Sequence, residues 1–236
     1  MIVVIGLPAY AGSAGGEESA GGLAADVAAA AHSQGSSVEL VGKIGDDGAG
    51  DAVVLALGRV GVGHAALLRD PARPTPVLSA VAVSTELATA GEAADALPAD
   101  VLAGDGGDDG PRLEVELLPP DPAARPGLEA GDISLALRYL AETRVVVLAE
   151  PLPEDAVAAV VEGATFAGAR LVVLVPPGAT PPPLPPEATL LEAPAVDDGS
   201  FGRVVGAFAA GLDAGTEPAA AFAEAVLEAG WEPVAD

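Results

Sequence analysis

The sequence predicts a single α/β domain over residues 1–236, with a mainly parallel sheet between two layers of helices. Short, continuous apolar runs alternate with Ala-rich segments of helical length, which is the rhythm of a parallel sheet with covering helices. Half of the 236 residues are hydrophobic, so a sizeable core can form. Because aromatic residues make up only 3% of the chain, small side chains must fill that core through close helix–sheet packing.

The first third of the chain contains three expected strands and two expected helices. The strands are apolar and rich in β-branched residues, and each helix is followed by glycines that end it. We expect the strands at residues 1–5, 37–41 and 76–84, and the helices at residues 24–32 and 51–60.

The middle of the chain, at about residues 90–127, is predicted to be rich in loops. It is small, polar and acidic, and its prolines cannot continue a helix. A short strand at residues 112–118 interrupts it. We expect this segment to be the least ordered part of the domain.

Regular elements return in the last hundred residues. Asp132 can cap a helix, and the apolar runs are typical of strands buried on both faces. The expected helices cover residues 132–140, 154–166, 204–212 and 218–229, and the expected strands cover residues 145–148, 171–175 and 189–192.

The charge balance limits the partners. Ten Lys and Arg stand against 35 Asp and Glu, a net charge of −25, which repels nucleic acid and anionic membrane surfaces. Cysteine is absent, so thiolate chemistry is excluded. The apolar first residues lack the positive flank of a signal peptide, and no apolar run approaches the roughly 20 residues of a membrane helix. We therefore expect a cytoplasmic protein.

An ordered series of motifs spans residues 21–76. Gly21 to Asp26 reads Gly-Gly-x-Ala-x-Asp, and Val41 to Gly50 reads Val-Gly-x-x-Gly-x-Asp-x-x-Gly. A helix, a Gly-Val turn and Thr75 follow. This series resembles the N-terminal signature of the ribokinase/PfkB family of carbohydrate kinases, which carries Asn where this chain has Asp26.

The resemblance implies a ribokinase-like three-layer α/β/α sandwich and a sugar site beside the glycine motifs. Its candidate substrate-binding residues are Gly21, Gly22, Asp26, Gly45 and Asp47. The alternative is that these glycines form turns and that the carboxylates cap helices or face solvent.

The family's phosphoryl-transfer loop is degenerate here. The loop of relatives reads Asp-Thr-x-Gly-Ala-Gly-Asp, and its last Asp is the general base. Aligned on the following helix, that position is Gly202, and a shift of one residue gives Arg203. Phe201 replaces the middle glycine and is expected to fill the phosphate position, while Asp197 and Asp198 oppose an anion. The degenerate anion-hole loop is therefore Gly199, Ser200, Phe201 and Gly202, and no catalytic residue is assigned.

Other family features are also expected to be lost. The lid strands should be missing because Gly6 and Gly21 are close in sequence. A sugar-binding Asp after the first strand and the Asn-x-x-Glu magnesium motif are not found. We expect no metal at His32 or His64, and a solvated acidic loop at residues 104–110.

Three functions follow from these observations. The first is a non-catalytic pseudokinase that binds a small sugar or nucleoside, or acts in assembly, with no cofactor. The second is an active ATP-dependent carbohydrate or nucleoside kinase of shortened design, which would need ATP and Mg. The third is a structural homo-oligomer without a ligand. Trp231, the only tryptophan, is expected to anchor the segment after the last helix, or to contact a partner.

Overall fold

The computed structural model describes residues 1–12, 18–78, 80–82, 115–117, 124–140, 142–194 and 199–230. The chain divides into two compact units, one formed by Met1–Leu78 with Pro119–Asp236 and the other by Ser79–Leu118. Each unit is considered by itself. Most of the loop-rich segment at residues 90–127 lies outside the described residues, so its expected lack of order stays a prediction. The assignment of residues 1–236 to one domain stays a prediction as well.

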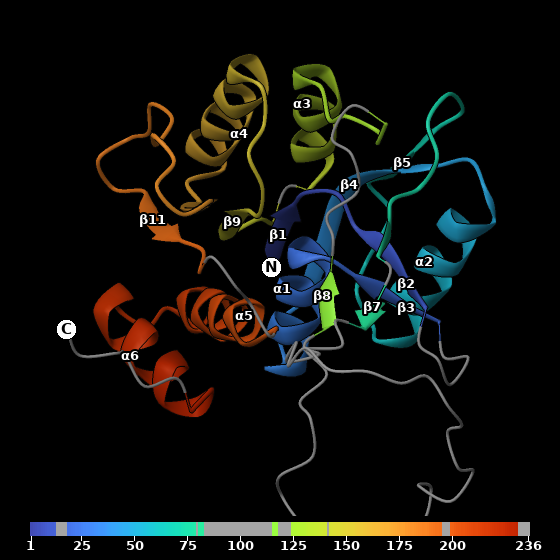
Figure 1. Ribbon diagram of the computed structural model, residues 1–236. Coiled ribbons are helices and arrows are strands. Elements are labelled where there is room, and N and C mark those ends of the chain that lie inside the picture. The colour runs from blue at the N-terminus through green and yellow to red at the C-terminus, as the bar shows by residue number, and fades with distance from the viewer. Residues whose placement is uncertain are drawn as a thin grey trace, which may run out of the picture. The chain divides into compact units, whose positions relative to one another are not determined.

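The main sheet of the first unit contains six strands. They are β1 (Ile2–Ile5), β4 (Val38–Gly45), β5 (Leu67–Asp70), β9 (Val145–Leu148), β10 (Arg170–Val175) and β11 (Thr189–Glu192). Their order in the sheet is β11-β10-β9-β1-β4-β5, and every neighbouring pair is parallel (Figure 1). The central strand is therefore β1, with β4 on one side and β9 on the other.

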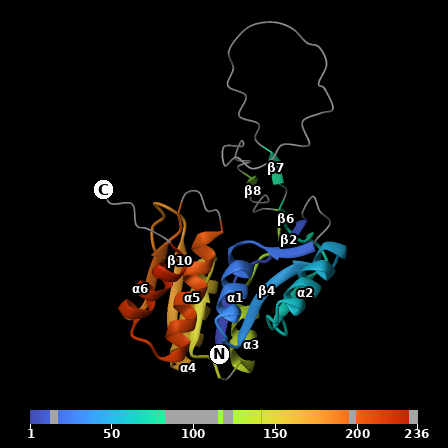
Figure 2. The same cartoon turned by 90° about the horizontal axis from the view of Figure 1, so that it is seen from below.

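Helices cover both faces of this sheet. They are α1 (Leu23–Ser33), α2 (Gly48–Arg59), α3 (Ala130–Tyr139), α4 (Glu154–Ala167), α5 (Ser200–Ala214) and α6 (Pro218–Glu228). One face carries α3 and α4, while α1, α2 and α5 lie on the other, with α6 beyond α5 (Figures 1 and 2).

Alternation along β1 shows how the strands join the two helix layers. Ile2 and Val4 belong to the core cluster that includes residues of α1 and α5. Val3 and Ile5 belong to the cluster that includes residues of α3 and α4. All four side chains are fully buried, as a strand covered on both faces requires. The predicted three-layer, mainly parallel fold is confirmed.

A small second sheet corrects the expectation of missing strands before α1. It contains β2 (Ala9–Gly12), β3 (Glu18–Gly21) and β6 (Val77–Leu78) in the order β3-β2-β6. The first two strands are antiparallel, with Ala9 opposite Gly21, and β6 runs parallel to β2. The chain between Gly6 and Gly21 thus forms two strands of four residues each, although we expected it to be too short for lid strands.

Two further differences concern short strands. The edge strand β5 was not predicted, and the strand predicted at residues 76–84 is divided between two sheets. Its first part is β6, whereas β7 (Ala80–Ala82) pairs antiparallel with β8 (Val115–Leu117) in the second unit. The strand predicted at residues 112–118 corresponds to β8.

Candidate functional site

The point where the chain reverses its direction of winding lies between β1 and β9. These strands are neighbours with Ile5 opposite Leu148, but the helix after β1 covers one face of the sheet and the helix after β9 covers the other. In open α/β sheets, ligands bind outside the carboxyl ends of the strands at such a point. This edge is therefore where a ligand site is expected.

Glu150 bridges the two strands at this edge. It lies two residues beyond β9, and its Oε1 accepts a hydrogen bond of 2.7 Å from the backbone N–H of Leu7, which follows β1. Its Oε2 lies 3.4 Å from Nη1 of Arg125. Burial raises the pKa of Glu150 above its ordinary value, although the Arg125 charge and the Leu7 N–H act in the opposite direction.

The sequence analysis did not identify Glu150. A lone carboxylate directly after a buried strand was the available signal, but it gains meaning only when the strand order shows that β9 lies beside β1. A carboxylate that keeps its proton more readily than usual, at the expected ligand edge, is a candidate for contact with a polar ligand.

Gly21 and Gly22 are placed next to the same edge. Gly21 ends β3, and Gly22 precedes the first residue of α1 with φ of 89°, a backbone conformation that favours glycine. A Cβ on Gly22 would lie 3.6 Å from the carbonyl oxygen of Leu7. A Cβ on Gly6 would lie 2.8 Å from that of Ala24, so α1 begins very close to the end of β1.

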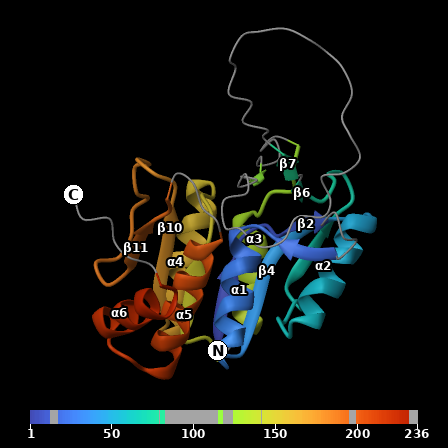
Figure 3. The same cartoon turned by 60° about the horizontal axis from the view of Figure 1, so that its bottom comes forward.

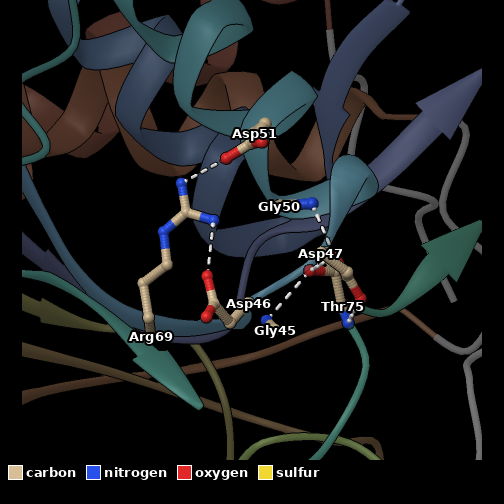
Figure 4. Close-up of polar contacts among 7 residues, drawn as sticks. All are labelled: Gly45, Asp46, Asp47, Gly50, Asp51, Arg69 and Thr75. Carbon is tan, nitrogen blue, oxygen red and sulfur yellow. Dashed lines mark hydrogen bonds and ion pairs between the residues drawn. The ribbon is translucent and has the colours of Figure 1, made fainter. Parts of the chain in front are cut away.

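Asp47 has a structural task at the end of β4. Its Oδ1 accepts hydrogen bonds from the N–H of Gly50 and from the hydroxyl of Thr75, at 2.8 and 2.6 Å (Figure 4). Its Oδ2 accepts a bond of 2.8 Å from the N–H of Thr75. The Thr75 hydroxyl in turn accepts a bond of 2.9 Å from the N–H of Gly45. One carboxylate thus caps α2 and fastens the segment before β6.

The electrostatics of Asp47 agree with this role. Desolvation raises its pKa, but the hydrogen bonds from Thr75 and Gly50, with the charge of Arg69, outweigh that effect and leave the pKa of Asp47 lowered. A Cβ on Gly45 would lie 2.5 Å from the Thr75 nitrogen, so the turn has no space for a side chain there. The motif at residues 45–50 therefore serves as a turn and a helix cap.

Asp26 and Gly202 are brought together by the packing of α1 against α5. A Cβ on Gly202 would lie 2.8 Å from that of Asp26, and a Cβ on Gly206 would lie 2.5 Å from that of Ala30. The two contacts advance in step along both helices, so α1 and α5 run parallel (Figure 3). Gly202 faces a neighbouring helix, and a larger residue there would require α1 to move.

The Phe201 side chain is buried, and its expected place at the phosphate position stays a prediction. The side chain is only 3% exposed and belongs to the core cluster shared by α1, α5 and the sheet. Its neighbour Gly199 adopts φ of 84° as the residue that precedes the helix. Asp197 and Asp198 lie outside the described residues.

The predicted site residues thus lie in three places, the first being the edge beside Gly21 and Gly22. Asp26, Gly199 and Arg203 line one hollow of about 700 Å³ between α1, α5 and α6. Gly45 is the last residue of β4, and Asp47 is the N-cap of α2. Within the described ranges, no group of three or more His, Asp or Glu residues is arranged to hold a metal ion. His32 and His64 instead lie near the carbonyl oxygens of Ser36 and Val62.

The strand order and the position of the ligand edge define a ribokinase-like α/β fold. A family model described as pfkB family carbohydrate kinase matches residues 13–101. The chain therefore resembles the PfkB carbohydrate kinases, as its motifs predicted. No curated protein matches the sequence.

Solved structures of sugar kinases share the fold at low sequence identity. Arabidopsis thaliana ribokinase, complexed with ribose and ATP, is 16% identical with a TM-score of 0.58, and the match covers 97% of this chain and 90% of that one. Fructokinase from Xylella fastidiosa is 14% identical with a TM-score of 0.51, and the match covers 98% of this chain and 69% of that one. An uncharacterized sugar kinase from Pyrococcus horikoshii, in complex with ATP, is 17% identical with a TM-score of 0.50. The match covers 74% of this chain, which spans only 52% of the length of that kinase.

None of the helices in the described ranges combines the length and the apolar character that crossing a membrane requires.

Proposed function

We propose that the chain is a non-catalytic relative of the sugar kinases that binds a small sugar or nucleoside at the edge between β1 and β9. The packing of Gly202 carries this proposal. The position that aligns with the family's general base faces α1 and has no space for a side chain. The first turn of α5 also contains no acidic residue that could replace it. A positioned base typically contributes 10²–10⁴-fold to such a reaction.

Glu150 supports the binding part of the proposal. Its carboxylate lies at the expected ligand edge and can accept hydrogen bonds from sugar hydroxyls. Its side chain is 16% exposed, so a ligand can reach it. Magnesium and ATP enter only if the chain is a kinase, and the described residues offer no carboxylate cluster that fits the metal.

Titration calorimetry with ribose, fructose and adenosine tests binding, and a coupled assay with ATP and Mg²⁺ tests turnover. We expect binding of at least one compound without phosphorylation. Glu150→Gln should weaken that binding about tenfold, since hydrogen bonds to charged groups contribute about 1.5–3 kcal/mol. Glu187→Gln, which changes an exposed carboxylate away from this edge, is the matched control.

Two results would overturn the proposal in different directions. Turnover at kinase rates of about 1–100 s⁻¹ would establish the active kinase, which is favoured by the likeness to a ribokinase complexed with ribose and ATP. Absence of binding to every compound would leave the structural homo-oligomer. That alternative is favoured by Tyr139 and Phe166, which are 79% and 93% exposed on α3 and α4, and the mass in solution tests it.

A further inference from the structure

The connection between β10 and β11 crosses the sheet without a helix. Because these adjacent strands are parallel, the chain must return from the carboxyl end of β10 to the amino end of β11. Such a crossover is usually helical, but residues 176–188 form neither helix nor strand (Figure 3). Leu184 and Ala188 pack against the core cluster that includes residues of α3 and α4, so the connection is held on that face of the sheet.

Prolines restrict the backbone of this connection. Residues 180–186 read Thr-Pro-Pro-Pro-Leu-Pro-Pro. Each proline holds its own φ at about −65°, and each residue that precedes a proline is driven toward extended ψ. Together these restrictions favour polyproline II, a left-handed helix with about three residues per turn. Ala188 then donates its N–H to the carbonyl oxygen of Pro185 at 3.0 Å, and this turn ends the run before β11.

The exposure of the side chains follows the same period of three residues. One ridge of the run is half-buried at every position, and another is exposed at every position. The half-buried ridge consists of Pro182, Pro185 and Ala188. The exposed ridge, called the proline ridge below, consists of Thr180, Pro183 and Pro186. The run is therefore attached along one side and presents the opposite side to solvent.

The chemistry of the run defines the kind of partner that fits it. Polyproline II segments dock into protein grooves that are lined by aromatic side chains, and a segment that is already rigid loses little conformational entropy on binding. The sequence has no Lys or Arg between residues 171 and 202, whereas the exposed Glu187 directly follows the run. A groove that reads a basic residue beside the prolines therefore does not fit, and a groove with a basic margin complements the carboxylate.

We propose that the proline ridge of Thr180, Pro183 and Pro186 is a docking surface for another protein that offers an aromatic-lined groove with a basic margin. The half-buried ridge supplies the attachment to the sheet, and the proline ridge supplies the contact. The inference is independent of the proposed function, because it needs no ligand at the edge between β1 and β9.

A WW domain with basic residues beside its aromatic groove is the probe. When the full chain is added to the isotope-labelled domain, the resonances of the groove residues should shift and reach saturation. Pro183→Ala with Pro186→Ala should weaken the binding about tenfold, since the proline ridge makes the contact. Pro71→Ala is the matched control and should leave the affinity unchanged. It removes an exposed proline that follows β5, which lies at the opposite edge of the sheet from β11.

A second variant keeps the test decisive if the double substitution unfolds the protein. Glu187→Lys leaves every proline in place and should weaken the binding several-fold, because the new charge repels the basic margin. Absence of saturable shifts with the wild-type chain would overturn the proposal, and so would shifts that both variants leave unchanged. A dimer in solution that the double substitution dissociates would also overturn it, because a second copy would then occupy the proline ridge.

Discussion

Gly202 carries a testable consequence of the packing between α1 and α5. Because a Cβ there would lie 2.8 Å from that of Asp26, Gly202→Ala should lower the free energy of unfolding by about 1–3 kcal/mol. Gly58→Ala is the control, since that helical glycine is exposed and a Cβ there would lie 3.7 Å from Cε1 of His64, an ordinary contact. It should be stabilising by about 0.5–1 kcal/mol. Urea unfolding of both variants checks this, and equal effects would contradict the close packing.

The same glycine limits any repair of the kinase site. Phe201→Gly with Gly202→Asp restores the glycine and the carboxylate of the family's loop, yet we expect no phosphorylation of sugars. The new carboxylate would press on α1, and the Phe201 ring would be lost from the core. A coupled assay on the double variant, with circular dichroism to check folding, tests this. Clear turnover would show that the rest of the kinase site is intact.

Glu150 predicts a pH dependence with a definite sign. Since burial raises its folded pKa, the folded state holds this proton to a higher pH than the unfolded chain does. Its contribution to stability is therefore full below the unfolded pKa of about 4.3 and is lost as the pH rises through the folded pKa. The free energy of unfolding of the wild type minus that of Glu150→Gln should fall from about pH 4 to neutral pH. A constant difference would contradict the raised pKa.

For single residues, the sequence predicted the roles of the backbone better than the roles of the side chains. Gly22 is the N-cap of α1, and Gly45 is the last residue of β4, where an added Cβ would meet the Thr75 backbone. The direction of Phe201 and the neighbours of Gly202 depend on how α5 packs, and one sequence contains no local signal for that. Glu150 was missed for the same reason, because strands distant in sequence create its surroundings.

The start of helix α2 depends on the Thr75 hydroxyl, which is far from it in sequence and donates a hydrogen bond to the capping residue Asp47. Thr75→Val keeps the shape of the side chain but leaves Asp47 and the N–H of Gly45 without their buried partner. We expect a loss of about 1–3 kcal/mol in the free energy of unfolding. Thr165→Val removes an exposed hydroxyl on α4 and should change stability by less than about 0.5 kcal/mol. Thermal unfolding of the two variants compares them, and a similar small effect for both would contradict the role of Thr75.

Elements with an uninterrupted apolar pattern were predicted most closely. The strand β9 reads Val-Val-Val-Leu and begins and ends where the sequence placed it. The bounds of β11 were also predicted, although it reads Thr-Leu-Leu-Glu. The edge strand β5 reads Leu-Leu-Arg-Asp, and its half-polar pattern gave no sign of pairing. Likewise, β2 and β3 are rich in Ala, Gly and Ser, which have weak strand preference, so their pairing with each other and with β6 decides their structure.

For the whole molecule, charge predicts a response to salt. The negative charges of a chain with net charge −25 repel one another in the compact state, whereas the exposed ion pairs of Arg69 and Arg73 contribute little to stability. Raising NaCl from about 0.01 to 0.1 M shortens the screening length from roughly 30 to 10 Å. The melting temperature should therefore rise over this range, and sucrose of equal osmolarity should raise it less. A melting temperature that falls with salt would show that attractive pairs dominate.

The pairing of Phe208 with Phe222 has a spectroscopic consequence. Their ring centroids are 5.7 Å apart at an interplanar angle of 86°, and Phe208 is fully buried between α5 and the sheet. Tyr139 is 79% exposed, so its environment changes little when the chain unfolds. The near-ultraviolet circular dichroism of the folded unit should thus include fine-structured phenylalanine bands, beside the signal of Tyr10, which packs against the same core cluster. Loss of those bands would report the separation of α6 from α5, an event that tyrosine absorbance would scarcely register.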